Sequence, residues 1–173
     1  SEAKEVDYSV RRDTTLEYAG YELVVSEWGD PSDPTILCVH GFLDQGPIWE
    51  EVALGLVAYG YRVIAPDLRG HGLSSHAKDS EYAGATDFIS DLDIVISRLT
   101  DGPVVIVGHS MGALLSALYA ASRPNRIKSL VMVETVIPGE ERVEDIVNNL
   151  RDSLSSSSRS LEHKVIKDLK LAA

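Results

Sequence analysis

Short apolar runs alternate along this chain with longer segments whose apolar residues recur at helical spacing. Four continuous runs have the length of strands that are buried on both faces of a sheet: residues 35–39, 62–65, 103–107 and 129–133. Two segments between them, residues 48–59 and 86–99, carry apolar stripes with the period of a helix, and residues 111–122 predict a third helix that is rich in small residues. This alternation predicts an α/β fold, a mostly parallel sheet with helices on both faces.

Both ends of the chain depart from this pattern. Residues 16–28 predict two strands that turn at Gly20, and residues 1–15 before them are expected to be an N-terminal linker. Residues 138–173 predict two amphipathic helices of the kind that form a lid, and no further strand. We therefore expect a core over residues 16–137 whose sheet is truncated after its sixth strand, followed by the start of a helical lid.

The composition disfavours a partner that is a nucleic acid or a membrane. The 173 residues include 27 acidic and 16 basic side chains, which gives a formal net charge of −11. A surface of this sign repels phosphate backbones and anionic lipid headgroups. The N-terminus lacks the apolar region of a signal peptide, no apolar run could cross a membrane, and the one cysteine cannot form an internal disulfide. We expect a soluble, cytoplasmic protein.

The sequence Gly-His-Ser-Met-Gly at residues 108–112 lies directly after one predicted strand and directly before a helix. Gly-x-Ser-x-Gly in this context is typical of a nucleophile elbow, a sharp turn that holds a serine clear of the sheet. The two glycines avoid crowding at the turn, and the helix N-terminus offers backbone N–H groups to an oxyanion. We therefore interpret Ser110 as a nucleophile.

A second loop is predicted at the same edge of the sheet, where His40, Gly41 and Phe42 follow a buried strand. Gly41 lets the backbone approach a substrate carbonyl, and the backbone N–H groups of Phe42 and Met111 are the expected oxyanion donors. We expect His40 to fix this loop rather than to act as the base. The expected substrate pocket consists of Gly41, Phe42 and the side chain of His109.

Three segments in this order resemble the α/β-hydrolase superfamily: His40-Gly41, residues 66–75 and residues 108–112. Further segments resemble the decarboxylating thioesterase domains of alkene-forming polyketide synthases, such as the curacin synthase. These segments are Trp28-Gly29, Gln45-Gly46, residues 49–54, Ser74-Ser75-His76, Val133-Glu134, Pro138 and Glu140-Glu141.

The resemblance implies an α/β-hydrolase fold and a serine thioesterase. It would hydrolyse an acyl chain carried on the phosphopantetheine of an acyl carrier protein, with no cofactor or metal of its own. A sulfotransferase domain of the same synthase would first sulfate the β-hydroxyl of that chain. Loss of carbon dioxide and sulfate from the released acid would then leave a terminal alkene.

For a serine triad the sequence offers a candidate acid but no candidate base. Glu134 follows the apolar run at residues 129–133, where a carboxylate could orient an imidazole, and the resembled thioesterases use a glutamate at this place. An acid beyond residue 173 is the alternative. None of the five histidines follows a final strand, so we expect the base to lie outside this sequence, which would then be part of a longer domain.

Three functions remain open at this point. The first is the carrier-dependent thioesterase, and the second is a carboxylesterase or carbon–carbon bond hydrolase with the same serine chemistry. The third is a non-catalytic binding protein of the hydrolase fold. We interpret Cys38 as a buried small apolar side chain, because its neighbours are apolar, and the histidines lack metal-ligand spacing.

Overall fold

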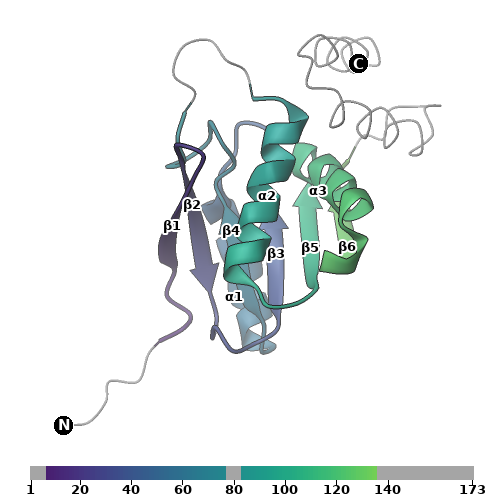
Figure 1. Cartoon of the computed structure of the whole chain (residues 1–173). Coiled ribbons are helices and arrows are strands. Elements are labelled where there is room, and N and C mark those ends of the chain that lie inside the picture. The colour runs from purple at the N-terminus through teal and green to yellow at the C-terminus, as the bar shows by residue number, and fades with distance from the viewer. Residues whose placement is uncertain (1–6, 77–82, 136–173) are drawn as a thin grey trace.

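A six-stranded sheet in the order β1-β2-β4-β3-β5-β6 forms the centre of the computed structural model, which describes residues 7–76 and 83–135. Its strands are β1 (Arg12–Tyr18), β2 (Tyr21–Trp28), β3 (Thr35–Val39), β4 (Arg62–Pro66), β5 (Val104–His109) and β6 (Ile127–Val133). Strand β2 is antiparallel to both β1 and β4, whereas β4, β3, β5 and β6 are mutually parallel (Figure 1). The mostly parallel α/β sheet that the sequence predicts is therefore confirmed.

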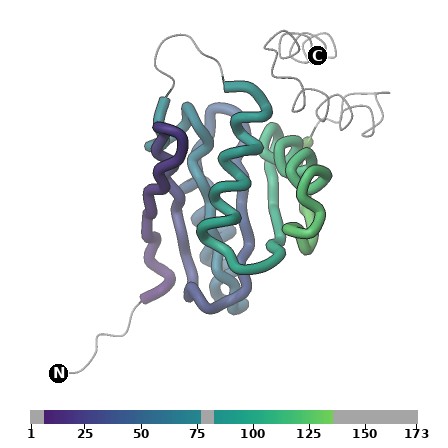
Figure 2. Tube along the Cα trace, in the orientation of Figure 1, coloured from purple at the N-terminus to yellow at the C-terminus, as the bar shows by residue number. Residues whose placement is uncertain are grey.

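Helices cover both faces of this sheet. They are α1 (Glu50–Ala58), α2 (Ala85–Leu99) and α3 (Met111–Ser122), with short 3-10 turns at Gly46–Trp49 and Pro124–Arg126. Helices α2 and α3 lie on one face and α1 lies on the other (Figures 1 and 2). None of the described helices is long and apolar enough to cross a membrane.

The sheet separates two apolar cores, because successive side chains of a strand point to opposite faces. Leu37, Val39 and Ile64 pack with α2 and α3 in the larger core. Cys38 and Val63 pack in the smaller core, together with residues of α1 and of the 3-10 turn before it. Strands β3 and β4 are buried on both faces, which explains their continuous apolar sequence.

The first strand begins earlier than the sequence predicts. Strand β1 starts at Arg12, so residues 12–15, which we had assigned to the linker, belong to the sheet. The apolar pattern gives no sign of these residues because β1 is an edge strand with largely exposed or half-exposed side chains. Residues 12–15 belong to the sheet because they pair with residues 24–27 of β2. The predicted lid helices in residues 138–173 lie outside the described residues.

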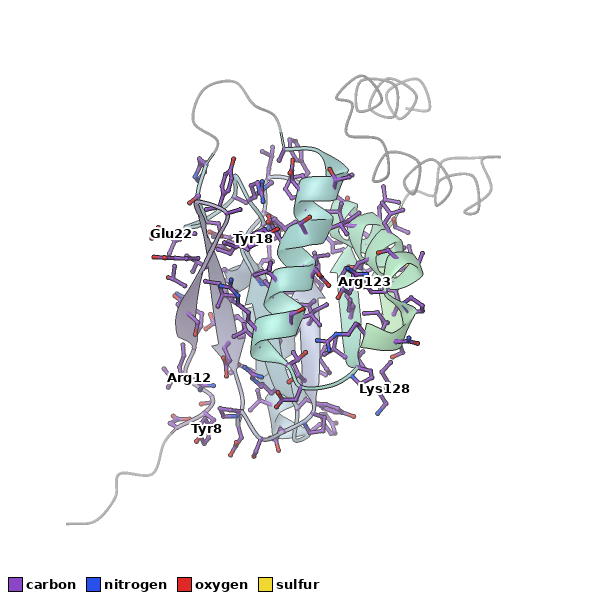
Figure 3. The ribbon with its side chains drawn as sticks, in the orientation of Figure 1. Tyr8, Arg12, Tyr18, Glu22, Arg123 and Lys128 are labelled. Atoms are coloured by element: carbon purple, nitrogen blue, oxygen red, sulfur yellow. The ribbon has the colours of Figure 1, made fainter. Side chains whose placement is uncertain are left out.

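A buried ion-pair network holds the open end of the β1–β2 hairpin. The carboxylate of Glu27 lies 3.1 Å from nitrogens of both Arg12 and Arg62. Burial alone would raise the pKa of Glu27, but hydrogen bonds and charge from the two guanidinium groups hold it below its usual value. Figure 3 shows Arg12 beside Tyr8, at the end of β1 opposite Tyr18 and Glu22. The network fixes the hairpin at the end of the sheet remote from the carboxyl ends of the parallel strands.

Candidate active site

Ser110 occupies the turn between β5 and α3, in the backbone geometry that a nucleophile elbow requires. Its backbone angles, φ of 53° and ψ of −120°, lie outside the regions that residues other than glycine normally adopt. The residue is exposed, and the first turn of α3 begins directly after it. The strained turn therefore presents the Ser110 hydroxyl to solvent beside a helix N-terminus.

The two glycines of the motif are required by their surroundings. A Cβ on Gly108 would lie 2.6 Å from the Cα of Ala113, closer than real Cβ contacts allow. A Cβ on Gly112 would collide with the backbone carbonyl oxygens of Val39 and His40. The spacing read from the sequence thus has a steric cause, since helix α3 passes close to the ends of β3 and β5.

The loop after β3 lies against the elbow, as the sequence analysis expects. A Cβ on Gly41 would lie only 3.3 Å from the Cβ of Ser110. The backbone N–H groups of Phe42 and Met111 donate no hydrogen bond to any other described residue. The loop therefore comes close to Ser110 and brings with it an N–H group that has no such partner.

His40 fixes this loop and is not available as a base. Its ring is fully buried, Nδ1 lies 2.7 Å from the carbonyl oxygen of Gly41, and Nε2 lies 3.0 Å from the backbone nitrogen of Leu68. The geometry requires Nδ1–H to donate to Gly41 and Nε2 to accept from Leu68, as in a neutral imidazole. Burial lowers the pKa of His40, which also favours the neutral form.

Glu134 follows β6 directly and therefore lies, like Ser110, at the carboxyl end of the parallel strands. Its φ is 48°, and its side chain is 83% exposed. The backbone N–H of Ser110 donates to the carbonyl of Val133 at 3.0 Å, which ties the elbow to the strand that carries Glu134. The Oε2 atom of Glu134 is 3.5 Å from Nε2 of His109, a contact that the sequence analysis did not anticipate.

No described histidine forms a hydrogen bond with Ser110. Both ring nitrogens of His40 are engaged, and Nδ1 of His71 lies 3.0 Å from the carbonyl oxygen of Arg69. His71 also packs its ring against His40, Phe42 and Phe88, and His76 is exposed. His163 lies outside the described residues. The described part of the chain therefore brings together the predicted nucleophile, oxyanion donors and acid, but no base for them.

Asp67 supports the loops at the carboxyl ends of the strands, a role that was not predicted from the sequence. It follows β4, is buried, and accepts the N–H of Gly46 at 2.6 Å and that of Leu73 at 2.8 Å, one on each carboxylate oxygen. A Cβ on Gly72 would collide with this carboxylate. Asp67 thus joins two loops at the carboxyl ends of the strands. Its position directly after a buried strand, in a glycine-rich segment, is the signal in the sequence.

Other chemistry finds little support in the described residues. Among residues 7–76 and 83–135, no group of three or more His, Cys, Asp or Glu side chains could hold a metal ion. Burial raises the pKa of the Cys38 thiol to about 12, so the thiol stays protonated and is no nucleophile. An exposed serine on a strained turn beside a helix N-terminus is the arrangement that nucleophilic attack on a carbonyl carbon uses.

The sheet topology and the elbow are those of the α/β-hydrolase fold, and comparison with known proteins agrees. Residues 34–156 match the model of the alpha/beta hydrolase fold family. This protein belongs to the α/β-hydrolase family.

Individual relatives differ in the reactions that their names give. The structure is similar to that of the thioesterase domain from the curacin biosynthetic pathway, with a TM-score of 0.73 and 43% identity, over 87% of this chain and 54% of that one. Epoxide hydrolase 2 of Siraitia grosvenorii is 35% identical over 68% of this chain and 37% of its own length. Lipase LipV of Mycobacterium tuberculosis is 32% identical over 73% and 47%. The chain thus spans about half or less of the length of each of these relatives.

Proposed function

We propose that this protein is a serine thioesterase that belongs to a polyketide synthase and acts on an acyl chain carried by an acyl carrier protein. The observation that carries the serine chemistry is the strained Ser110 between β5 and α3, exposed and beside the loop of Gly41 and Phe42. The choice of a thioester is supported by the 43% identity to the curacin thioesterase domain.

In this proposal Ser110 Oγ attacks the thioester carbonyl while a histidine from outside the described residues takes its proton. The N–H groups of Phe42 and Met111 stabilise the oxyanion, and Glu134 orients the histidine. Collapse of the tetrahedral intermediate expels the pantetheine thiol, which receives the proton. Water then hydrolyses the acyl-enzyme by the same steps and releases a carboxylate.

The finer proposal concerns what the carboxylate does next. If the acyl chain carries a β-sulfate, loss of carbon dioxide supplies the electron pair that forms the alkene as sulfate leaves. The partners would be an acyl carrier protein and an upstream sulfotransferase domain of the same synthase, in the cytoplasm. The enzyme itself would need no cofactor, because the substrate arrives on the carrier's phosphopantetheine. Gly41, Phe42 and His109 would line the acyl pocket.

The test is a comparison of substrates with the full-length protein. Matched acyl-pantetheine thioesters and simple oxygen esters are assayed, each with and without a β-sulfate, and the products are analysed for terminal alkene. We expect the thioesters to react faster, the sulfated one to give the alkene, and Ser110→Ala to abolish both turnover and labelling by a fluorophosphonate. A preference for oxygen esters would instead establish a carboxylesterase. A protein that fluorophosphonate does not label would be a binding protein of this fold.

A further inference from the structure

His109 contacts two parts of the candidate site at once. We propose that His109 is a positioning residue, which holds the carboxylate of Glu134 in place for the histidine that activates Ser110. The proposal rests on the serine-hydrolase chemistry proposed above. It gives the residue before the nucleophile a part in the reaction, in addition to its proposed place in the wall of the acyl pocket.

The sheet register brings His109 and Glu134 together. His109 ends β5 and pairs with Val133 of β6, so Glu134 begins directly beyond the paired residue. The hydrogen bond from Ser110 N–H to the carbonyl of Val133 closes the same junction on the other side of His109. With the two backbones tied in this way, Nε2 of His109 and Oε2 of Glu134 are 3.5 Å apart.

The other edge of the imidazole faces the oxyanion loop. A Cβ built on Gly41 would lie 3.2 Å from Nδ1 of His109, so this edge of the ring lies against the backbone of that loop. One ring therefore spans the distance from the loop of the proposed oxyanion donors to the proposed acid. A ring that packs at one edge against backbone has less freedom to move, and it gives the carboxylate at its other edge a better-defined partner.

The contact between His109 and Glu134 affects the position of the carboxylate more than the free energy of unfolding. The side chain of Glu134 is 83% exposed, and ion pairs and hydrogen bonds at such sites add little to the free energy of unfolding. In this proposal Nε2 of His109 occupies Oε2 of the carboxylate, and Oε1 accepts from the imidazole of the base. Restricting the directions of an exposed carboxylate matters for the rate, because misplacement by about 1 Å can cost about 100-fold.

The experiment measures the rate at which a fluorophosphonate labels Ser110 in the full-length protein, together with kcat and KM for an acyl-pantetheine thioester. We expect His109→Leu to lower the labelling rate and kcat by about 10-fold, with little change in KM or Tm. His109→Gln should retain most of the rate, because its amide N–H can replace Nε2–H. In a Glu134→Ala background, which leaves no acceptor for His109, adding His109→Leu should change nothing further. His76→Leu, at an exposed histidine, is the matched control.

Several results would overturn this role. Equal labelling of wild type and His109→Leu would do so, as would an equal loss in the Glu134→Ala background, or no rescue by His109→Gln. A raised KM with unchanged kcat would mean that His109 contributes to the pocket wall only. If labelling depends on His109 as expected but thioesters are not turned over, the positioning role stands and the thioesterase proposal fails. If wild-type Ser110 is not labelled at all, both fail.

Discussion

Two carboxylates, Asp67 and Glu134, directly follow strands at the same end of the parallel sheet, but their surroundings are opposite. Asp67 is 3% exposed, and each of its oxygens accepts a backbone N–H. The Glu134 side chain is 83% exposed, lies 3.5 Å from Nε2 of His109, and stands on a residue with φ of 48°. A buried carboxylate that accepts two backbone N–H groups holds loops together. An exposed carboxylate on a strained backbone, beside the elbow, is the better candidate for chemistry.

The largest effect should come from removing the exposed carboxylate. Glu134→Ala in the full-length protein is expected to lower kcat by roughly 10³–10⁴, the loss seen when a catalytic histidine loses its orienting acid. The free energy of unfolding should change little, because the side chain is mostly solvated. Steady-state kinetics and denaturant unfolding measure the two effects, with Glu17→Ala, at an exposed glutamate of β1, as the control. Wild-type turnover would place the acid elsewhere in the protein.

Removing the buried carboxylate should have the opposite profile. Asp67→Ala leaves the N–H groups of Gly46 and Leu73 without their acceptors. The hydrogen bond of Gly46 is buried, and an unsatisfied buried donor costs about 1–3 kcal/mol, whereas Leu73 is exposed and water can replace its acceptor. We expect the free energy of unfolding to fall by about 2 kcal/mol, measured by denaturant unfolding. Asp101→Ala, at an exposed turn residue, is the control. An unchanged stability, with loss of kcat alone, would mean that Asp67 acts in the reaction and would remove the contrast between the two acids.

The sequence predicts best those features that restrict which residues can stand at consecutive positions. The Gly-x-Ser-x-Gly spacing predicted the elbow because Gly108 and Gly112 have no room for a side chain, Gly108 beside Ala113 of the following helix and Gly112 beside the backbone of Val39 and His40. The apolar runs predicted β3 and β4 because these strands are buried on both faces. These features need only a few neighbouring residues to be recognised.

Features that depend on strand register or on partners remote in the chain could not be predicted from the sequence. The start of β1 at Arg12 depends on pairing with β2, and the edge strand carries no apolar pattern. The contact of His109 with Glu134 depends on the β5–β6 register and on a positive φ. Asp67 is satisfied by the N–H of Gly46, which lies on another loop. In each case the deciding partner is remote in the chain or is a backbone group without a sequence signature.

The smallest expected effect tests whether the Glu134 backbone is kept strained for function. A non-glycine residue in the left-handed region costs about 1–2 kcal/mol, which glycine avoids. Glycine also increases the conformational entropy of the unfolded chain, which costs about 0.5–1 kcal/mol. The first quantity exceeds the second, so Glu134→Gly should raise the free energy of unfolding by about 0.5 kcal/mol while lowering kcat as Glu134→Ala does. Lys128→Gly, on β6, has no such strain to relieve and should lose about 0.5–1 kcal/mol. Equal destabilisation by the two glycine variants would show that Glu134 is not strained, and its conformation would then be no sign of a functional acid.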